Sequence, residues 1–283
     1  MPLMPLRPFP ALFLKGGSER VLVISDLHLG WEVALAEKGI HVPSQTSKIL
    51  DKITHLIKAQ KPTTLLFLGD VKHTIATAEW EEWRDVPDFF EALGGLVEDI
   101  RVIPGNHDGN LEPLLPENVK LLPMNGVILW KDTGLFHGHT WPAPELLGCH
   151  SLIMGHVHPT VAFRDPIGFR VTRQVWVKAS CDGRRLARLV LKNLNVKVHK
   201  EPGETLKDRF NVKLRTSELF VMPAFNEFLG GQPMNQKHPG RGSSYGMFNS
   251  PVLRSKGVDT QAAELYLLDG TFLGSISQLT ALS

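Results

Sequence analysis

Five apolar runs in the first 160 residues are each followed by side chains of the types that bind metal ions. These side chains are, in chain order, Asp26, His28, Asp70, His73, Asn106, His107, Asp108, His137, His139, His156 and His158. Short apolar runs of this kind are typical of buried strands. An open α/β sheet binds its ligands beyond the carboxyl ends of its strands. The chain is therefore predicted to form an α/β fold with one polar site at the strand ends.

Strand signals recur along the chain and crowd together in its second half. The ranges that predict strands are 11–26 (two strands and a Gly-rich turn), 63–70, 100–108, 127–130, 134–139, 151–156, 160–165 and 170–179. Near the C-terminus, Asp269-Gly270 lies between two apolar runs and predicts a hairpin. Together with the helices, this pattern favours a sheet-rich sandwich covered by helices.

Two helices are predicted between the first strands. An apolar stripe indicates one at 44–62, with Ser44 or Thr46 as its N-cap and Pro62 at its end. The second is predicted at 78–93, where Pro87 is expected to break the helix or to delay its start.

The chain shows no internal repeat and no linker, so residues 1–283 are predicted to form a single domain. Residues 11–182 would be the core that carries the polar residues. Residues 183–283 would complete the same body with a basic stretch, a mobile Gly/Pro/Ser loop at 232–251 and the C-terminal hairpin.

The donor types predict a transition-metal site. Carboxylates, one amide oxygen and several imidazoles, without a thiolate, suit Mn²⁺, Fe²⁺, Zn²⁺ or Co²⁺ better than Ca²⁺ or Mg²⁺. There are more candidate ligands than one ion can use, and a pair of ions ~3.5–4 Å apart would use them. If strand geometry persists, Asp26 with His28, and His156 with His158, would point to one side as i, i+2 pairs. Taken singly, the Asp and Asn residues could instead cap helices or form turns, but the ordered set favours metal binding.

The motifs D-x-H, G-D, G-N-H-D, H-G-H and G-H-x-H occur in this order across residues 26–158. In this the chain resembles the calcineurin-like metallophosphoesterase family. The resemblance implies a four-layer αββα sandwich and two divalent ions, with Mn expected first and Fe, Zn, Co or Ni as alternatives. It assigns Asp26, His28, Asp70 and His158 to one ion, and Asp70, Asn106, His137 and His156 to the other. His139 is the alternative to His137 and would otherwise support the ligands by hydrogen bonding.

The resemblance also implies catalytic roles. His107 would face the phosphate and protonate the leaving group, with Asp108 orienting its ring. The segments GDVKH, GNHDG and VMPAFNEFLGG are further similar to SbcD-related archaeal phosphoesterases and bacterial DNA ligase-associated phosphoesterases. His73 matches a histidine of the family's break-repair nucleases, although a surface or supporting role fits it as well.

Charge gives a weaker hint about the partner. The formal net charge is only +2, but residues 164–215 carry 14 Lys/Arg against 5 Asp/Glu. This stretch would bind DNA or RNA, or would be a solvated β face. The two cysteines form no motif, and neither a signal peptide nor a membrane-length apolar run is present, so a cytoplasmic protein without membrane contact is expected.

Three functions follow from these observations. The first is a phosphodiesterase acting on nucleic acid, a nuclease linked to DNA repair. The second is a small-molecule phosphodiesterase or phosphomonoesterase. The third is a non-catalytic scaffold, against which the complete ligand set argues.

Overall fold

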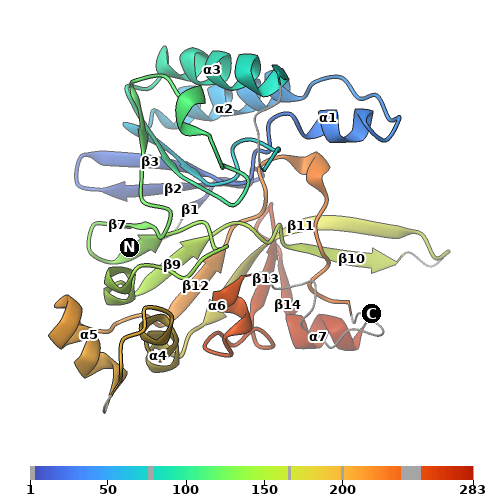
Figure 1. The fold of residues 1–283 in the computed structure, drawn as a ribbon. Coiled ribbons are helices and arrows are strands. Elements are labelled where there is room, and N and C mark those ends of the chain that lie inside the picture. The colour runs from blue at the N-terminus through green and yellow to red at the C-terminus, as the bar shows by residue number, and fades with distance from the viewer. Residues whose placement is uncertain (1–3, 76–79, 165–166, 199–200, 237–249, 283) are drawn as a thin grey trace. The chain divides into compact units, whose positions relative to one another are not determined.

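A computed structural model describes residues 4–75, 80–164, 167–198, 201–236 and 250–282. The chain divides into two compact units (Figure 1). Unit 1 comprises Met1–Met124 and Ala224–Leu229, and unit 2 comprises Asn125–Pro223 and Gly230–Ser283. Each unit is built on one mixed sheet.

Unit 1 contains a six-stranded sheet in the order β1-β2-β3-β4-β5-β6. Its strands are β1 (Met4–Pro5), β2 (Ala11–Gly16), β3 (Glu19–Ile24), β4 (Thr64–Leu68), β5 (Asp99–Ile103) and β6 (Val119–Leu121). β1, β2 and β3 pair antiparallel, whereas β3 to β6 run parallel. The carboxyl ends of β3, β4 and β5 therefore lie at the same edge of the sheet, as the sequence predicted.

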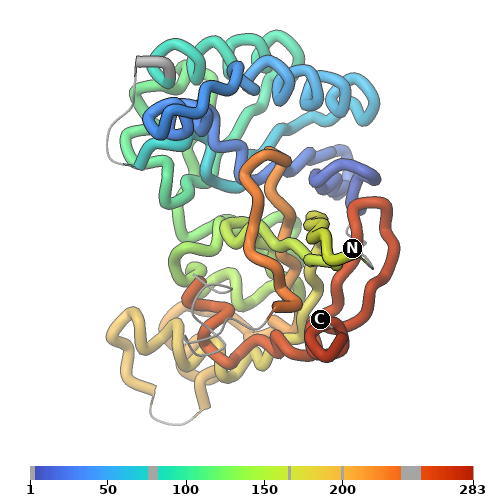
Figure 2. The backbone as a smooth tube through the Cα atoms, turned by 90° about the vertical axis from the view of Figure 1, so that its right-hand side faces the viewer, coloured from blue at the N-terminus to red at the C-terminus, as the bar shows by residue number. Residues whose placement is uncertain are grey.

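Helices cover one face of this sheet. The helical elements of unit 1 are α1 (Trp31–Ala36), α2 (Thr46–Gln60), α3 (Trp80–Gly94), η1 (Glu112–Leu114) and η3 (Glu227–Leu229). Ile53 of α2 and Phe90 of α3 belong to the same buried cluster as Phe67 of β4. Figures 1 and 2 both show α2 and α3 side by side.

Two details of these helices differ from the sequence prediction. The N-cap of α2 is Gln45, whose side chain makes no capping bond. Neither Ser44 nor Thr46 is the N-cap residue, although the Ser44 hydroxyl accepts the Thr46 N–H at 3.3 Å. Glu32 of α1 accepts the Gln45 N–H at 3.1 Å. Pro87 neither breaks nor delays α3, which continues on both sides of it. Pro87 has no backbone N–H to donate to the preceding turn. Burial of Phe89 and its neighbours compensates for this lost hydrogen bond, so the helix stays continuous.

Unit 2 contains an eight-stranded sheet with the path β14-β13-β11-β12-β9-β8-β7, and β10 pairs with β11. The strands are β7 (Val127–Leu129), β8 (Thr133–Leu135), β9 (Ser151–Met154), β10 (Thr160–Arg164), β11 (Arg170–Ser180), β12 (Glu218–Val221), β13 (Glu264–Leu267) and β14 (Phe272–Ser275). The helical elements are η2 (Pro144–Gly148), α4 (Gly183–Asn193), α5 (Pro202–Phe210), α6 (Pro251–Arg254) and α7 (Ile276–Ala281). β8, β9 and β12 are parallel neighbours, and the remaining pairs are antiparallel.

The basic stretch, residues 164–215, contains two helices, α4 and α5. Leu186 and Val190 of α4 are buried in the same cluster as Val177 and Leu219 of the sheet. A solvated β face is therefore the wrong description of residues 183–193 and 202–210, which form α4 and α5. Each of these helices buries an apolar stripe and exposes its basic side chains, as an amphipathic helix does.

The α/β class, the strands that lead to the polar motifs and the C-terminal hairpin are confirmed. The hairpin joins β13 to β14 around Asp269 and Gly270. Most of the loop predicted to be mobile, 232–251, lies outside the described residues. The single-domain organisation stays a prediction. Among the described residues, no helix has the length and apolarity needed to cross a membrane.

Candidate metal centre

The loop after β3 carries Asp26 and His28 on left-handed backbone. Their φ angles are 59° and 47°. β3 ends at Ile24, so the strand alternation expected for this i, i+2 pair does not persist. Hydrogen bonding to the next loop holds the pair instead: the Asp26 N–H donates to the Gly69 carbonyl at 3.0 Å. The His28 N–H donates to the Asp70 carbonyl at 2.9 Å.

Asp70 follows β4 in the same manner, with φ 53° after Gly69 at φ 83°. Its Oδ2 lies 3.4 Å from Nε2 of His28. Asp26, His28 and Asp70 present ligand atoms within 4.8 Å of one another, and all three side chains are buried. Ser25 donates a 2.6 Å hydrogen bond to Oδ2 of Asp26 and fixes that carboxylate. Unit 1 thus gathers three of the predicted ligands at one point.

The loop after β5 packs directly on Asp70. The His107 N–H donates to Oδ1 of Asp70 at 2.8 Å. A Cβ at Gly105 would lie 2.1 Å from the same oxygen, so only glycine allows this close approach. Asp108 reaches back: its Oδ1 accepts the Val71 N–H at 2.9 Å and its Oδ2 accepts the Gly105 N–H at 2.8 Å. The carboxylate of Asp108 therefore fastens the two loops together.

Asn106 supplies the only amide among the predicted ligands. Its Oδ1 is buried, and no hydrogen-bond donor among the described residues reaches it. A buried carbonyl oxygen without a donor costs free energy unless something else satisfies it. A bound cation at this oxygen would do so, and the donor chemistry fits one.

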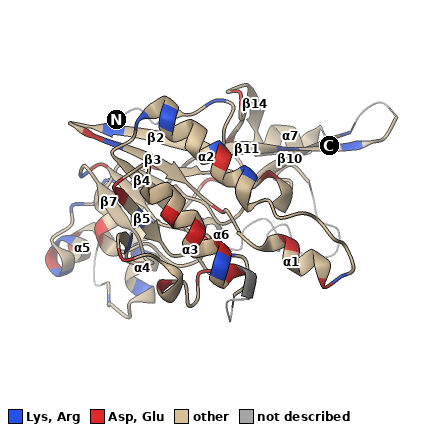
Figure 3. Cartoon of the chain, turned by 90° about the horizontal axis from the view of Figure 1, so that it is seen from above, with Lys and Arg blue, Asp and Glu red and all other residues tan. Residues whose placement is uncertain are grey.

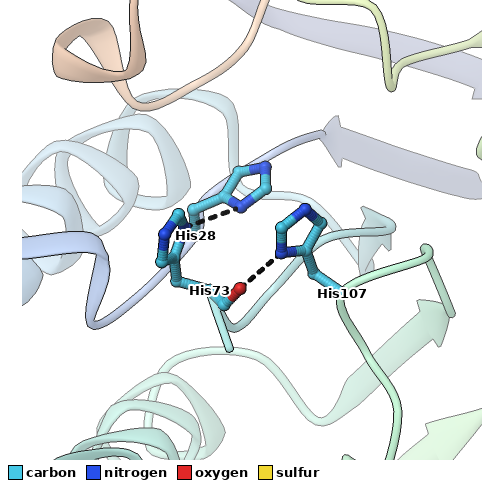
Figure 4. A group of neighbouring side chains, drawn as sticks. All are labelled: His28, His73 and His107. Atoms are coloured by element: carbon cyan, nitrogen blue, oxygen red, sulfur yellow. Dashed lines mark hydrogen bonds between the residues drawn. The ribbon is translucent and has the colours of Figure 1, made fainter. Parts of the chain in front are cut away.

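Three histidines lie together beside these ligands (Figure 4). Nδ1 of His73 is 3.4 Å from Nδ1 of His28. The ring of His107 lies 4.6 Å from that of His28, and its Nδ1 bonds the carbonyl oxygen of His73. A carbonyl can only accept, so His107 carries a proton on Nδ1 and its Nε2 is the nitrogen left for chemistry. Burial, and next the neighbouring His107, lowers the pKa of His73.

A buried ion pair next to His73 was not predicted from the sequence. The Lys72 side chain has no exposed surface, and its Nζ lies 4.0 Å from Oε2 of Glu82. Glu82 also accepts the N–H groups of His73 and Thr74 at 3.1 and 2.8 Å. Burial lowers the pKa of Lys72, while Glu82 raises it. The only sequence signal was a lysine within GDVKH, because pairing with Glu82 depends on how α3 packs.

Unit 2 brings together the histidines that follow β8 and β9. The parallel pairing of these strands continues past their ends, since the Gly155 N–H donates to the His137 carbonyl at 3.0 Å. The rings of His137 and His156 lie 5.1 Å apart, and each offers a nitrogen within 4.8 Å of the other's. The ring of His139 lies 5.3 Å from that of His137 and 6.1 Å from that of His156.

His156 and His158 also adopt left-handed backbone, with φ 73° and 43°. β9 ends at Met154, so strand alternation does not align this pair either. The backbone of Gly231 closely approaches that of His158: a Cβ at Gly231 would lie 2.1 Å from the His158 carbonyl oxygen. A Cβ at Gly138 would lie 2.4 Å from Cε of Met154.

The cysteines lie apart from this chemistry. Cys149 is buried and Cys181 is half-buried, and neither forms a disulfide. Burial raises the pKa of Cys149 to about 11 and that of Cys181 to about 12, so both stay protonated thiols near neutral pH. The candidate ligands are therefore imidazole, carboxylate and amide groups, the set that borderline divalent ions prefer.

Three comparisons with known proteins bear on the family of the chain. The family model described as calcineurin-like phosphoesterase matches residues 19–198. No curated protein sequence matches the chain. Among solved structures, the nuclease MPE of Pseudomonas putida aligns with a TM-score of 0.51 at 19% identity, over 96% of this chain and 99% of that one. Yfce, a phosphoesterase from E. coli, aligns with a TM-score of 0.33 at 22% identity, over 51% of this chain and 73% of that one.

The fold agrees with the family match, because two mixed sheets with covering helices are the parts of a metallophosphoesterase sandwich. The chain belongs to the calcineurin-like phosphoesterase family, whose activity is the metal-dependent hydrolysis of phosphoesters.

Proposed function

We propose that this chain is a phosphodiesterase with two divalent ions, and that it acts on nucleic acid. The proposal assigns Asp26, His28, Asp70 and His158 to one ion. It assigns Asp70, Asn106, His137 and His156 to the other, with Asp70 as the bridge. His137 is preferred to His139 because its ring is fully buried and offers a nitrogen within 4.8 Å of one on His156.

The observation that carries the proposal is the cluster of Asp26, His28 and Asp70, drawn from two different loops. Each of the three residues has left-handed backbone, which costs roughly 1–2 kcal/mol for an ordinary L-residue. Hydrogen bonds from Ser25 and His107 fix the two carboxylates in addition. Strain of this kind persists where the surrounding structure holds side chains for a purpose, and it clusters at ligand sites.

When bound, a pair of divalent ions supplies an activated water and positive charge for the phosphoryl oxygens. The residues of the chain supply the rest. His107 donates through Nδ1 to the His73 carbonyl, and this backbone contact would help to fix the orientation of its ring. Nε2 of His107 would bind a phosphoryl oxygen and, when protonated, would give its proton to the leaving oxygen.

His73 would assist His107 in this proposal. Its lowered pKa keeps it neutral near pH 7, so it adds no charge that would repel a cation. Its Nδ1 and its carbonyl fix His28 and His107 respectively. Glu82 accepts the His73 N–H and so holds the backbone of His73. Asp108 accepts the Lys72 N–H and so joins the loop after β4 to the loop after β5.

Nucleic acid is proposed as the substrate on two grounds. Residues 164–215 carry a net charge of +9, which suits a phosphate backbone. A solved structure that aligns over nearly the whole chain is described as a nuclease, which is consistent with such a substrate. Manganese as the natural metal, a role in DNA repair and a cytoplasmic location stay predictions.

A panel of substrates tests the proposal. Purified protein, stripped with a chelator and reloaded with Mn²⁺, would be assayed with bis-p-nitrophenyl phosphate, p-nitrophenyl phosphate, cyclic nucleotides, and single- and double-stranded DNA and RNA. The expected result is metal-dependent cleavage of bis-p-nitrophenyl phosphate and of at least one nucleic acid. Cleavage of cyclic nucleotides or the monoester alone would establish a small-molecule enzyme instead. No cleavage of any substrate with Mn²⁺, Fe²⁺, Zn²⁺, Co²⁺ or Ni²⁺ would support a scaffold.

A further inference from the structure

The hairpin of β10 and β11 extends beyond the rest of its sheet. Residues 175–178 of β11 pair with β13 and residues 177–180 pair with β12, but residues 170–174 pair only with β10. Figure 1 shows the end of this hairpin running out past β13 and β14. The described residues of the extension, 160–164 and 167–174, include three arginines and no acid.

The two faces of the extension carry different side chains. Residues directly opposite each other in an antiparallel pair point to the same side. Phe163 therefore lies beside Val171 on one face, and they are 38% and 37% exposed. Beyond them, Ile167 and Phe169 are 80% and 68% exposed. An exposed apolar cluster of this kind on a charged hairpin indicates a binding surface.

The opposite face carries two arginines as a direct pair. Arg164 lies opposite Arg170, and both are exposed. Like charges at directly opposite positions destabilise a hairpin, and an anion between them removes that repulsion. The same hairpin thus offers aromatic surface on one side and a paired positive charge on the other.

The base of the hairpin is joined to the histidines of unit 2. β10 begins at Thr160, just after His156, His158 and Pro159. The Val175 N–H donates to the Pro159 carbonyl at 3.1 Å, which ties β11 to the same point. Strand β10 is ~14 Å long at the usual rise per residue. A ligand that runs along the hairpin is therefore led toward His156 and His158.

We propose that the extension is a binding arm for single-stranded nucleic acid, with Phe169 and Phe163 stacking on bases and with Arg164 and Arg170 contacting phosphates. The proposal names the form of nucleic acid and the contacts for the proposed function, on which it rests. Aromatic rings that stack on bases, together with arginines that follow the backbone, are how proteins hold single strands without sequence preference. A duplex hides its base faces, so the exposed rings favour a single strand over a duplex.

Binding is measured with the metal-loaded protein and a fluorescent twenty-nucleotide single strand whose linkages resist hydrolysis. Phe169→Ala is expected to weaken binding roughly 5- to 150-fold, the range for loss of one stacked base. Phe169→Trp, which keeps an aromatic face, should restore it. Phe272→Ala is the matched control, because it removes an exposed ring (56%) from β14 of the same sheet. The double variant Arg164→Gln/Arg170→Gln should make the log–log salt slope about 1.4 less steep, at about 0.7 per lost contact.

Other outcomes identify other occupants and overturn the inference. Loss of binding to anionic phospholipid vesicles in Phe169→Ala, with unchanged binding to the strand, would assign the extension to a membrane surface. Conversion of a wild-type dimer into a monomer by the same variant would assign it to a second copy of the chain. Equal affinity of wild type and Phe169→Ala for the single strand would show that the extension does not bind single-stranded nucleic acid through Phe169.

Hydrolysis separates this inference from the proposed function. In one outcome, wild type cleaves bis-p-nitrophenyl phosphate while Phe169→Ala binds the strand as well as wild type does. This result would contradict the binding role of the extension and would leave the proposed phosphodiesterase activity supported. If wild type binds the strand through Phe169 but hydrolyses no substrate, the binding role of the extension is supported and the proposed function is wrong.

Discussion

At the scale of single residues, the backbone at the proposed ligands is the most informative feature. Of the twelve described non-glycine residues with positive φ, five are proposed ligands: Asp26, His28, Asp70, His156 and His158. The residue types could be predicted from the sequence, because strands ended in Asp and His. The left-handed conformation could not, because it depends on hydrogen bonds between loops that are distant in sequence. The i, i+2 argument paired Asp26 with His28, which do come together, but through hydrogen bonds between loops and not through strand alternation.

The bridging role of Asp70 gives the first prediction. Asp70→Asn keeps the Oδ1 that accepts the His107 N–H, so the loop should keep its shape. The charge shared by both ions is lost, and occupancy of both ions should fall. Elemental analysis of the purified variant measures this, with Asp51→Asn on the exposed face of α2 as the control. Two fully occupied ions in Asp70→Asn would show that this carboxylate does not bridge.

His107 should behave differently because it is proposed to contact substrate and not metal. His107→Gln should keep the metal content of wild type while kcat falls by roughly 10²–10⁴, the usual loss for an acid–base group. The fall should be smaller with a p-nitrophenolate leaving group, which needs little protonation. His41→Gln, an exposed histidine outside the proposed site, is the control. Equal losses for good and poor leaving groups would exclude the acid role and leave charge stabilisation.

At the scale of elements, Asp99 joins three strands at the amino end of the parallel sheet in unit 1. Its carboxylate contacts Arg101 on β5 at 2.5 Å, Lys120 on β6 at 2.8 Å and Thr64 on β4 at 2.9 Å. Burial raises the pKa of Asp99, but these hydrogen bonds outweigh burial and hold the pKa at about 2. This end of the sheet lies opposite the ligand loops, so its role is stability.

The pH dependence of stability tests this contact. Because the folded pKa of Asp99 is below its ordinary value of 3.8, the ionised carboxylate stabilises the fold above that pH. The stabilisation should be lost as the pH falls through 3.8 toward 2. Near pH 7, Asp99→Asn should lower the free energy of unfolding by on the order of 1 kcal/mol, since the ion pairs are partly exposed. Urea unfolding between pH 7 and pH 3 should show the two proteins converging; a constant difference would assign the effect to something other than ionisation.

Predictability differed between elements for physical reasons. Strands such as β4 were predictable because all five of its residues are buried and four of them are apolar. α4 was not predicted because basic residues interrupt its apolar positions, although Asp182 caps it by accepting the Arg185 N–H at 3.0 Å. The continuity of α3 through Pro87 was not predictable, because packing against the sheet outweighs local propensity. The Lys72–Glu82 ion pair could not be predicted from the sequence either, because it depends on how α3 packs against the sheet.

At the scale of the whole molecule, charge is distributed unevenly along the chain. Residues 164–215 carry a net charge of +9, and the remaining residues carry −7. The stretch runs from the end of β10 through β11, α4 and α5, all within unit 2, and Figure 3 colours the Lys and Arg positions of the ribbon blue. Three arginines of α4 (Arg184, Arg185 and Arg188) are exposed. Arg184 lies 3.9 Å from Glu201, but both are exposed and such pairs contribute little.

Salt dependence decides whether this asymmetry serves a polyanion. Each phosphate neutralised by the protein releases condensed counterions, which gives a log–log slope of about −0.9 per contact on duplex and about −0.7 on single strands. Replacing Arg184, Arg185 and Arg188 with Ala should therefore flatten the slope for nucleic acid. Hydrolysis of bis-p-nitrophenyl phosphate should barely change, because so small a substrate needs only the ions and His107. A wild-type slope in the triple variant, or no binding by wild type at low salt, would remove the role proposed for residues 164–215. A small-molecule phosphodiesterase would then be the better account of the chain, because the ligand cluster of Asp26, His28 and Asp70 does not depend on where the arginines lie.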